Sequence, residues 1–524
     1  MGETAYEAIR PLRIHLWRIA ALTRGLTTAG YGFIGGGFAL ALVFRFWHLN
    51  DVGYNSDEAV YAGQAKALAH NPEALPFFPV FRAHPLLFQT ILSFGYQVGT
   101  GDLFGRLLAG AFGAGTVALV YMTGRLLYGR RAGVLAALMI ALMPYDVLVS
   151  RQVLLDGPAT FFATASLYLV ARYATTLHRP WLYAAGGAMG LTILAKETSI
   201  LAIGALFVFF ALSPEVRTRT RDLAYAGAAM FAVALAYPLS IHLAGGGHRG
   251  QNYLVWQLFR RPNHEWSFYP TNVPSAMGPL VVACAFLGLF LLRRQMSWRE
   301  TLLLSWIFVP SVFFQLWPVK GFQYLLPCAP PVALLAGRML AHWRPPSLEF
   351  RTLRLPGAAV SVALSVLVLT SLGLETWRRI EPSDKGTFIA GSGGLPGGRQ
   401  TGRWIDANTP LGSEFLAIGP SMANLVSFYG FRKAYGISVG PNPLRRNPAY
   451  EPIGNADLAL RRNEIQYIVW DAYSAARSPF FANQLLAKAK KYNGRLVYGI
   501  TLRLRTKSGS TASRPLIQVY KVRS

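Results

Sequence analysis

Apolar stretches of roughly 16–22 residues recur between residues 29 and 374, and each is about long enough to cross the hydrocarbon core of a bilayer. The pattern predicts about eleven spanning helices. Their expected ranges are 29–49, 105–126, 132–150, 158–175, 181–195, 198–212, 222–243, 274–292, 301–317, 324–341 and 355–374. The chain is therefore expected to be a polytopic α-helical membrane protein.

Arginines cluster before the first apolar segment and in every second loop after it, as at Arg293 and Arg294 after the eighth segment. Cytoplasmic loops carry such an excess of basic residues. The pattern predicts a multi-pass protein of the cytoplasmic (plasma) membrane with a cytoplasmic N-terminus. An odd number of spans then places the C-terminal part outside the cytoplasm.

The apolar segment 84–98 is too short to span the membrane comfortably, and a crossing there would invert every later arginine-rich loop. We therefore interpret it as an interfacial helix lying on the outer surface. Residues 50–104 are then expected to form one long external loop with interfacial helices.

The composition changes near residue 375, where charge rises and Gly, Pro and Asn interrupt the apolar pattern. The chain is thus expected to divide into a membrane part, 1–374, and an extracytoplasmic α/β domain, 375–524. Its expected strands are Glu414–Ile418, Tyr467–Trp470, Arg495–Ile500 and Leu516–Val522, and its expected helices are 398–408, 456–464 and 480–491. None of its residues suggests catalysis.

The formal net charge of +27 does not indicate a nucleic-acid partner, because part of it is the cytoplasmic arginine set. Residues 375–524 hold 22 Lys and Arg against nine Asp and Glu. That excess suits anionic lipid headgroups or an acidic glycan, and it suits solubility near any bilayer equally well. Membrane lipids are expected partners.

Asp57 and Glu58 are two adjacent carboxylates just after the first apolar segment. Acids in the first turn of a helix that Asn55 or Ser56 caps would have a purely structural explanation. The functional interpretation makes one of them a general base at the membrane surface. Adjacent helical residues point about 100° apart, so one carboxylate is expected to face the site, and we favour Asp57.

Two further charged positions fall in expected external turns. Asp156 stands two residues before Pro158, which is also an ordinary helix start. Lys196 and Glu197 interrupt an apolar run, where charges are costly and usually functional. Lys196 is suited to hold a phosphate as a point charge, and the alternative is a solvated ion pair in a helix hairpin.

Other basic and aromatic side chains lie in the same expected external loops. They are Arg82, His84, Arg151, Lys320 and Tyr324. Basic and aromatic residues also gather in the expected external loop 244–273, among them Arg260 and Trp256. Such a mixture suits a lipid headgroup or a sugar phosphate, and it also suits an ordinary interfacial belt. No His, Asp or Glu spacing identifies a metal site, so a requirement for a divalent metal stays open.

The order and spacing of these residues resemble the GT-C glycosyltransferases, specifically the bacterial relatives of dolichyl-phosphate-mannose–protein mannosyltransferases and of lipid A aminoarabinose transferase. The resemblance covers most of residues 29–340. It rests on Asp57-Glu58, His84-Pro-Leu-Leu87, Arg151 to Asp156-Gly-Pro158, Ala195-Lys-Glu-Thr198, and Lys320 to Tyr324-Leu-Leu-Pro327. Two positions depart from the pattern: Gln323 stands where many relatives have a basic residue, and His84 replaces a lysine.

This resemblance implies the GT-C fold and transfer of a sugar from a polyprenyl-phosphate donor, usually with inversion, to a glycan, lipid or protein acceptor outside the cytoplasmic membrane. It makes Asp57 the base and Asp156 a second acid that orients a substrate or the base. A leaving phosphate needs positive charge, which Lys196, Arg82, His84 or Arg151 would supply. The competing classes are a flippase or transporter of a lipid-linked saccharide and a non-catalytic scaffold. The clustering of charge on one face and the lack of an inverted repeat favour the transferase.

Overall fold

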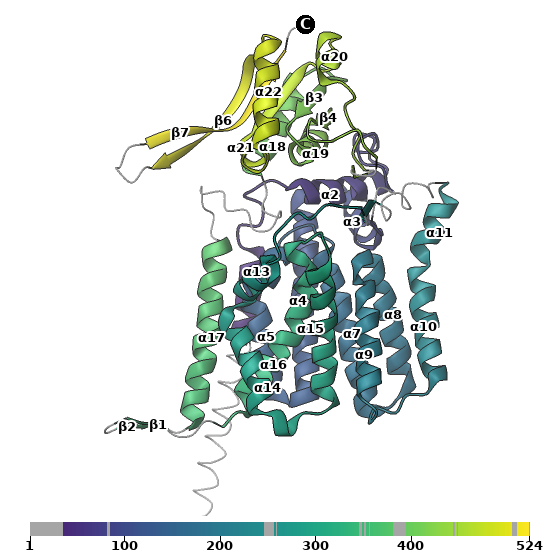
Figure 1. Ribbon diagram of the computed structural model, residues 1–524, viewed down its shortest axis with the longest axis vertical. Helices are drawn as coiled ribbons and strands as arrows, with labels where there is room; N and C mark the ends of the chain where they lie inside the picture. Colours follow the sequence, from purple (N-terminus) through teal and green to yellow (C-terminus); the bar gives the residue numbers. More distant parts are fainter. Residues whose placement is uncertain are drawn as a thin grey trace, which may run out of the picture.

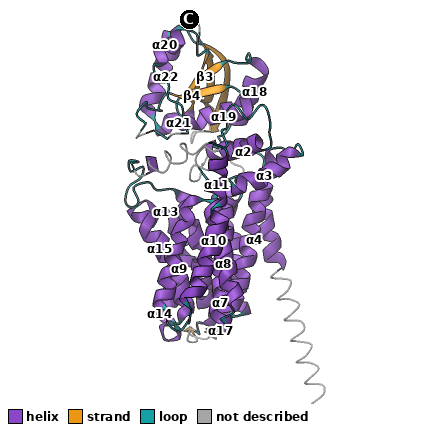
Figure 2. Ribbon diagram, turned by 90° about the vertical axis from the view of Figure 1, so that its right-hand side faces the viewer, coloured by secondary structure: helices purple, strands orange, loops and turns teal. Residues whose placement is uncertain are grey.

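The computed structural model describes residues 35–80, 84–245, 256–257, 259–344, 348–350, 353–355, 357–380, 395–443, 446–447, 449–505 and 511–522. Long helices lie side by side in one bundle, and a smaller unit with a β-sheet stands at one end of it (Figure 1). Figure 2 shows the same two layers after a quarter turn, with the strands confined to the upper unit.

Each of the eleven apolar segments coincides with helical structure over its described residues, and residues 29–34 of the first segment lie outside them. The bundle contains the helix Gly35–Phe46, α4 (Asp102–Tyr128), α5 (Arg130–Leu142), α6 (Pro144–Ser150), α7 (Asp156–Thr176), α8 (Arg179–Ala195), η1 (Glu197–Ile200), α9 (Leu201–Leu212), α10 (Thr220–Ala234), α11 (Ala236–Leu243), α13 (Phe268–Met277), α14 (Pro279–Leu291), η2 (Arg293–Gln295), α15 (Trp298–Leu316), η3 (Phe322–Cys328), α16 (Ala329–His342) and α17 (Gly357–Ile380). The last helix runs past the boundary expected at residue 374.

Two of these segments are bent rather than continuous. The axes of α5 and α6 meet at 56°, and those of α13 and α14 at 96°. At the second break Gly278 adopts a φ of +91°, which favours glycine, and Pro279 begins the next helix without an amide hydrogen to satisfy. The bend brings α13 to the end of the bundle that carries the sheet unit (Figure 1).

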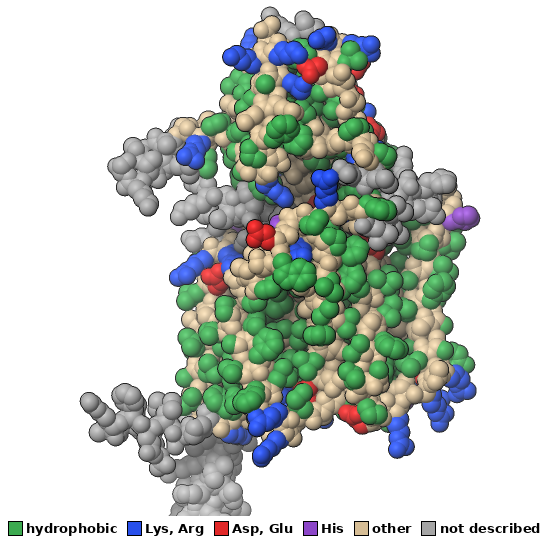
Figure 3. All heavy atoms as spheres, viewed as in Figure 1, with side chains coloured by type: hydrophobic (Ala, Val, Ile, Leu, Met, Phe, Trp, Pro, Cys, Tyr) green, Lys and Arg blue, Asp and Glu red, His purple; other side chains and the backbone are tan. Residues whose placement is uncertain are grey.

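Four helices of the described chain are long and apolar enough to cross a membrane, or up to six if each bent pair is one span. Two shorter apolar helices, Gly35–Phe46 and Glu197–Leu212, accompany them. Apolar side chains cover the flank of the bundle, and Lys and Arg gather along its lower edge (Figure 3). The chain is thus a multi-pass membrane protein, while the count of about eleven spans and its orientation stay predictions.

Two helices lie across the upper end of the bundle, beneath the sheet unit (Figure 1). They are α2 (Ser56–Leu68) and α3 (Leu87–Gln97). The segment 84–98 therefore forms an 11-residue helix, as expected from its length. Its place at a membrane surface stays a prediction.

The upper unit, called here the sheet domain, covers residues 395–522 and contains a five-stranded sheet in the order β4-β3-β5-β7-β6. Its elements are α18 (Gly398–Asn408), β3 (Glu414–Ala417), α19 (Pro420–Gly430), β4 (Lys433–Gly436), α20 (Ala456–Arg461), β5 (Tyr467–Asp471), α21 (Ala472–Arg477), α22 (Pro479–Lys491), β6 (Arg495–Arg505) and β7 (Thr511–Lys521). All four expected strands and all three expected helices are present. β4, α19 and α21 were not foreseen, nor was the small hairpin of β1 (Leu348–Phe350) and β2 (Leu353–Leu355).

The sheet domain shares a hydrophobic core with the surface helices. Tyr54 and Phe78, which flank α2, pack in one cluster with Phe415, Phe428 and Tyr429 of the sheet domain. The opposite face of the sheet is covered by α20 and α22 in a separate cluster. The described residues around α2 and the sheet domain thus form one packed unit above the bundle.

Candidate active site

The start of α2 is fixed by a reciprocal cap. Oδ1 of Asn55 accepts hydrogen bonds from the amides of Asp57 (2.8 Å) and Glu58 (2.9 Å), and Oε2 of Glu58 accepts one from the amide of Asn55 (3.0 Å). Such a capping box satisfies amides that have no partner inside the helix. It also aims the two neighbouring carboxylates in different directions.

Glu58 points into the protein. Its carboxylate is fully buried, accepts from Nε and Nη2 of Arg106 at 2.8 Å each, and accepts from the amide of Val153 at 3.1 Å. With the cap, these partners use the acceptor positions of the carboxylate. Glu58 borders none of the clefts described below. The geometry therefore favours Asp57 over Glu58 as the base, and the catalytic role expected of Glu58 stays a prediction.

Asp57 points the other way and lines two clefts at the upper end of the bundle. Within the described part of the chain, no ion pair joins it to a cation. Burial raises the pKa of Asp57, while the positive field of His84 and Lys196 partly offsets that rise, and the nearby Asp156 adds to it. A carboxyl group with a raised pKa is a stronger proton acceptor than an ordinary aspartate.

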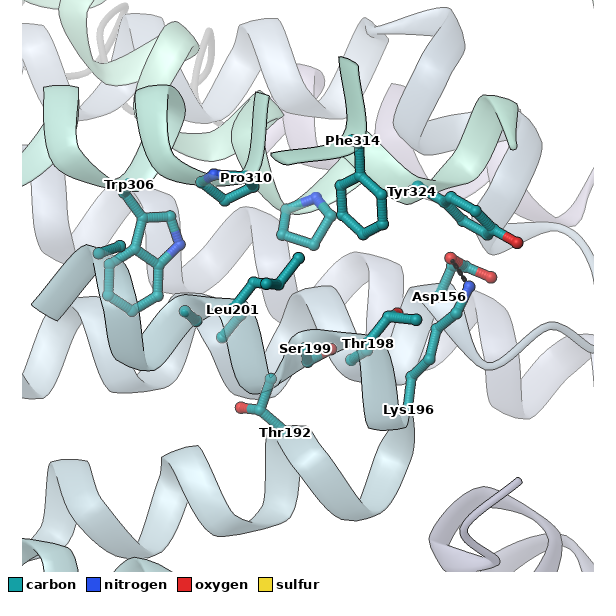
Figure 4. A pocket seen from close by; sticks show the side chains of 15 residues that line it. Asp156, Thr192, Lys196, Thr198, Ser199, Leu201, Trp306, Pro310, Phe314 and Tyr324 are labelled. Atoms are coloured by element: carbon teal, nitrogen blue, oxygen red, sulfur yellow. Dashed lines mark hydrogen bonds and ion pairs between the residues drawn. The ribbon is translucent and has the colours of Figure 1, made fainter. Parts of the chain in front are cut away.

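Lys196 and Asp156 form a buried ion pair between two helices. Asp156 is the first residue of α7, and Lys196 follows the last residue of α8; Nζ of the lysine donates to Oδ1 of the aspartate at 2.6 Å. The ammonium group also lies 4.6 Å from the ring centre of Tyr324 in η3. Figure 4 shows the three side chains together at one end of a pocket. The structure therefore joins three residues that are distant in sequence.

His84 and Glu197 form a second pair beside the first. Nδ1 of the histidine lies 3.0 Å and 2.9 Å from the two carboxylate oxygens of Glu197. The imidazole ring also makes an edge contact with Tyr61 of α2, with centroids 5.8 Å apart. These contacts place His84 at the rim of the cleft that Asp57 and Lys196 line.

Three connected cavities surround these residues. An apolar groove of about 490 Å³ begins at Asp156, Lys196 and Tyr324. The rest of its wall includes Ala159, Ala163, Leu201, Ala202, Ala205, Trp306, Pro310 and Phe314. In Figure 4 Trp306 lies at the end opposite Lys196, and Thr192, Thr198 and Ser199 lie between the two ends. The charged side chains are therefore confined to one end, while three hydroxyl groups lie along the groove.

The second cavity, called here the polar cleft, has a volume of about 1080 Å³ and contains Asp57, His84, Lys196, Glu197 and Tyr324. It adjoins the apolar groove at Lys196 and Tyr324, which line both. The site thus has an apolar arm and a charged chamber that meet at one cation.

The third cavity, called here the wide cleft, has a volume of about 1640 Å³ and shares Asp57 and Tyr324 with the polar cleft. Lys320 lies on its wall, but its ammonium group donates to the backbone oxygens of Gln315 (3.2 Å) and Trp317 (3.3 Å). Lys320 therefore secures the turn that carries Tyr324 as well as bordering the cleft.

One of the expected phosphate ligands is not brought into the site. Arg151 donates from Nη1 to the carbonyl oxygen of Phe44 and from Nη2 to that of Trp47, each at 2.7 Å, and lines none of the three cavities. It tethers the end of the helix Gly35–Phe46 instead. Arg82 lies outside the described residues.

Several cleft residues were not singled out as site residues from the sequence. Tyr61 of α2 and Thr198 of η1 line the polar cleft. The sheet domain, in which nothing suggested catalysis, contributes Tyr450 to both clefts and Tyr473 and Arg477 to the wide cleft. The sequence around a single tyrosine or arginine does not indicate that it lines a cleft. These residues reach the clefts only because the sheet domain packs on the bundle.

The carboxylates and histidines of the site are paired with cations or spread apart. Within the described part of the chain, no group of three or more His, Cys, Asp or Glu side chains is arranged to hold a metal ion. The question of a divalent metal therefore stays as open as the sequence left it.

Several known proteins are similar to this chain in sequence. The family model described as dolichyl-phosphate-mannose-protein mannosyltransferase matches residues 83–242. An uncharacterized protein of Aquifex aeolicus is 24% identical over 64% of this chain and 68% of its own length. The undecaprenyl phosphate-alpha-4-amino-4-deoxy-L-arabinose arabinosyl transferase of Yersinia enterocolitica is 25% identical over 52% of this chain. The match spans only 51% of that transferase.

Solved structures share the fold over nearly the whole chain. ArnT from Cupriavidus metallidurans in the apo state superposes with a TM-score of 0.67 and 16% identity, covering 94% of this chain and 98% of ArnT. The archaeal oligosaccharyltransferase AglB from Archaeoglobus fulgidus was solved with an inhibitory peptide and a dolichol-phosphate. It superposes with a TM-score of 0.60 and 14% identity, covering 92% of this chain and 74% of AglB. The chain thus has the fold of the GT-C membrane glycosyltransferases and resembles the aminoarabinose and protein-mannosyl transferases.

Proposed function

We propose that this protein is a membrane glycosyltransferase that moves a sugar from a polyprenyl-phosphate donor to an acceptor on the outer face of the cytoplasmic membrane. The observation that carries the proposal is the junction of the apolar groove with the polar cleft at Lys196 and Tyr324. A ligand with a long apolar tail, a charged link and a polar sugar would match the three surroundings in that order. The known partners of the relatives, undecaprenyl phosphate for ArnT and dolichol-phosphate for AglB, have this character.

Lys196 would hold the phosphate of the donor. Its ammonium group has three donors, of which the contact with Asp156 uses one. A phosphate could thus bind without breaking the ion pair, and Asp156 would orient the lysine. His84, held by Glu197 on the same cleft, would lie beside the phosphate. Charge-assisted bonds of this kind stabilise the negative charge that grows on a leaving phosphate.

Asp57 would act as the general base. The acceptor hydroxyl would enter through the wide cleft and give its proton to the Asp57 carboxylate as its oxygen forms a bond to the anomeric carbon. The bond between that carbon and the phosphate oxygen breaks, and its electron pair leaves with the polyprenyl phosphate. A single displacement by the acceptor inverts the anomeric centre. The acceptor is a glycan, a lipid or a protein.

The test is transfer of a radiolabelled sugar from a polyprenyl-phosphate donor by the purified protein in lipid vesicles. We expect label in the acceptor fraction and release of polyprenyl phosphate in equal amounts. The anomeric configuration of the product, read by NMR coupling constants, is expected to be opposite to that of the donor. Movement of the intact donor across the vesicle membrane with no bond cleavage would overturn the proposal in favour of a flippase.

A further inference from the structure

We propose that Asn424 and Tyr429 of the sheet domain are positioning residues that hold the Asp57 carboxylate in place for transfer. Both belong to α19. Tyr429 hydrogen-bonds Tyr54 in the loop before α2, and Asn424 hydrogen-bonds Ser56, the first residue of α2. The inference rests on the proposed function of Asp57 as the base. It assigns the sheet domain a part in catalysis although the domain supplies no reacting group.

The contact of Tyr429 is with the backbone. Its hydroxyl oxygen accepts a hydrogen bond of 2.9 Å from the amide of Tyr54, three residues before Asp57. Tyr54 is fully buried, and its ring packs 5.3 Å from Phe428 and 6.2 Å from Tyr429. An amide in such surroundings has no water to replace a lost acceptor. The sheet domain therefore fixes the backbone at residue 54.

The contact of Asn424 is with the residue next to the base. Its Nδ2 donates to Oγ of Ser56 at 2.9 Å, and the asparagine side chain is buried between the two parts. Ser421 and Leu425 of the same helix line the wide cleft together with Asp57. α19 is therefore both the clamp on the start of α2 and a wall of the cavity into which Asp57 points.

Arg399 of α18 extends the same contact. It donates to the carbonyl oxygen of Asn50 (2.9 Å) and to its side-chain Oδ1 (2.7 Å), and to the carbonyl oxygen of Val52 (3.3 Å). The backbones approach so closely that a Cβ on Gly53 would lie 2.8 Å from Cβ of Arg399. The loop before α2 is thus in contact with the sheet domain along its length.

The bundle holds the same loop from the other side. Arg106 of α4 donates to the carbonyl oxygens of Leu49 (2.8 Å), Val52 (2.7 Å) and Gly53 (3.0 Å), in addition to its ion pair with Glu58. Asp57 therefore projects from a segment clamped between two rigid parts. Removing one clamp leaves the segment attached and allows it to shift. A shift of about 1 Å at a reacting group can lower a rate about 100-fold.

The experiment compares Asn424→Ala and Tyr429→Phe with Ser427→Ala in the full-length protein. Ser427 lies on the same helix and donates within the sheet domain, to the carbonyl oxygen of Arg432 at 3.2 Å, so it controls for loss of one hydrogen bond in α19. Three quantities are measured: kcat at saturating donor, donor Kd, and the rate of amide hydrogen exchange in peptides covering residues 50–61. Asp57→Asn serves as the reference for loss of the base.

We expect Asn424→Ala and Tyr429→Phe to lower kcat about 10- to 100-fold. Donor Kd should change less than about threefold, because the phosphate ligands lie on other elements. Exchange in residues 50–61 should quicken in both variants and stay unchanged in Ser427→Ala. Ser56→Ala should match Asn424→Ala, and the double variant should be no worse than either, because the two side chains make one bond.

Two results would overturn the inference. One is a kcat in Asn424→Ala and Tyr429→Phe equal to that of Ser427→Ala while Asp57→Asn is inactive, which would leave the proposed function intact. The other is an unchanged rate of amide hydrogen exchange in residues 50–61, which would show that Asn424 and Tyr429 do not hold this segment, whatever the activity. If the unsubstituted protein transfers no sugar, the proposed function fails and this inference fails with it.

Discussion

The ammonium group of Lys196 lies 2.6 Å from Oδ1 of Asp156 at the point where the apolar groove meets the polar cleft. Replacing Lys196 by alanine removes the proposed phosphate ligand, and we expect donor Kd to rise about 10- to 100-fold, the range for a hydrogen bond to a charged group. Lys196→Arg should lose less because it keeps the charge. The measurement is binding of radiolabelled donor to the purified protein.

The alanine change also leaves Asp156 buried without its cation, which can destabilise the site by itself. The double variant Lys196→Ala/Asp156→Asn removes that cost and should show the same loss of affinity. Arg151→Ala is the control, since that guanidinium group is engaged by two backbone oxygens and lines none of the three cavities. Unchanged donor binding in the double variant would make Lys196 a structural residue.

Asp57→Asn and Glu58→Gln should separate rate from stability. Asparagine cannot accept the proton, so we expect Asp57→Asn to lose about 10²–10⁴-fold in transfer rate. Its thermal stability should be unchanged or higher, because the variant no longer ionises a carboxyl group whose pKa is raised by burial. Transfer rates and thermal melting of both variants in detergent are the measurements.

Glu58→Gln should do the reverse. It leaves Arg106 buried without its countercharge, which we expect to lower stability by about 3 kcal/mol, the lower end for breaking a buried pair. The fraction that remains folded should transfer sugar much faster than Asp57→Asn. A variant that stays fully stable but inactive at position 58 would move the base to Glu58.

The transfer rate should fall on acidification at a higher pH than the one at which an ordinary aspartate is protonated. Burial raises the pKa of Asp57 above its usual 3.8, so the carboxylate is lost as the pH falls through that raised value. Below it the base carries a proton and cannot accept another. The check is the pH dependence of kcat in the unsubstituted protein and in His84→Gln. The acid limb should move to higher pH in His84→Gln, because the field of His84 lowers the pKa of Asp57, and the loss of the acid limb in that variant would contradict the assignment.

The apolar groove should discriminate by chain length. Ala202 and Ala205 of α9 line it beside Leu201, and a phenylalanine at residue 202 would occupy part of its volume. We expect Ala202→Phe to raise the KM of a long polyprenyl donor at least about fivefold, since each lost methylene contact costs about 0.8 kcal/mol. A short-chain donor is the matched control and should be little affected. Equal effects on both donors would place the tail elsewhere.

The orientation in the membrane can be tested with single cysteines. Both native cysteines, Cys284 and Cys328, are buried, so the background is low. Cysteines introduced at the exposed positions Leu411 and Gln295 lie in the sheet domain and at the opposite end of the bundle. An impermeant thiol reagent should label Leu411→Cys in intact cells and should not label Gln295→Cys. The opposite pattern would invert the topology.

The helices were predictable because an apolar run long enough to span a bilayer has few other folded forms. Their interruptions were harder: the run 274–292 contains Gly278 and Pro279, and only the structure shows that α13 and α14 meet there at 96°. The strand β4 was missed because Lys433–Gly436 has four residues and no alternating pattern. Its strand character comes from parallel pairing with β3.

Residues that line the cavities were predictable where charge interrupts an apolar run, as at Lys196, and where a helix start gathers acids, as at Asp57. Sequence cannot say which backbone oxygens a side chain will meet. Arg151 and Lys196 both looked like phosphate ligands, yet carbonyl oxygens of Phe44 and Trp47 engage Arg151. The residues of the sheet domain escaped notice for a related reason, since their place depends on contacts across more than 350 positions of chain.

Gly53 limits which C-terminal domains could replace the sheet domain on this bundle. Any side chain at that position would meet the backbone and Cβ of Arg399 and push α18 away from the loop. A different α/β domain grafted onto the bundle would therefore have to fit closely against Gly53, which has no Cβ. It would also have to make the hydrogen bonds beside that glycine. We therefore expect substitutions in the sheet domain and in the loop before α2 to occur together, although the two segments are far apart in the sequence.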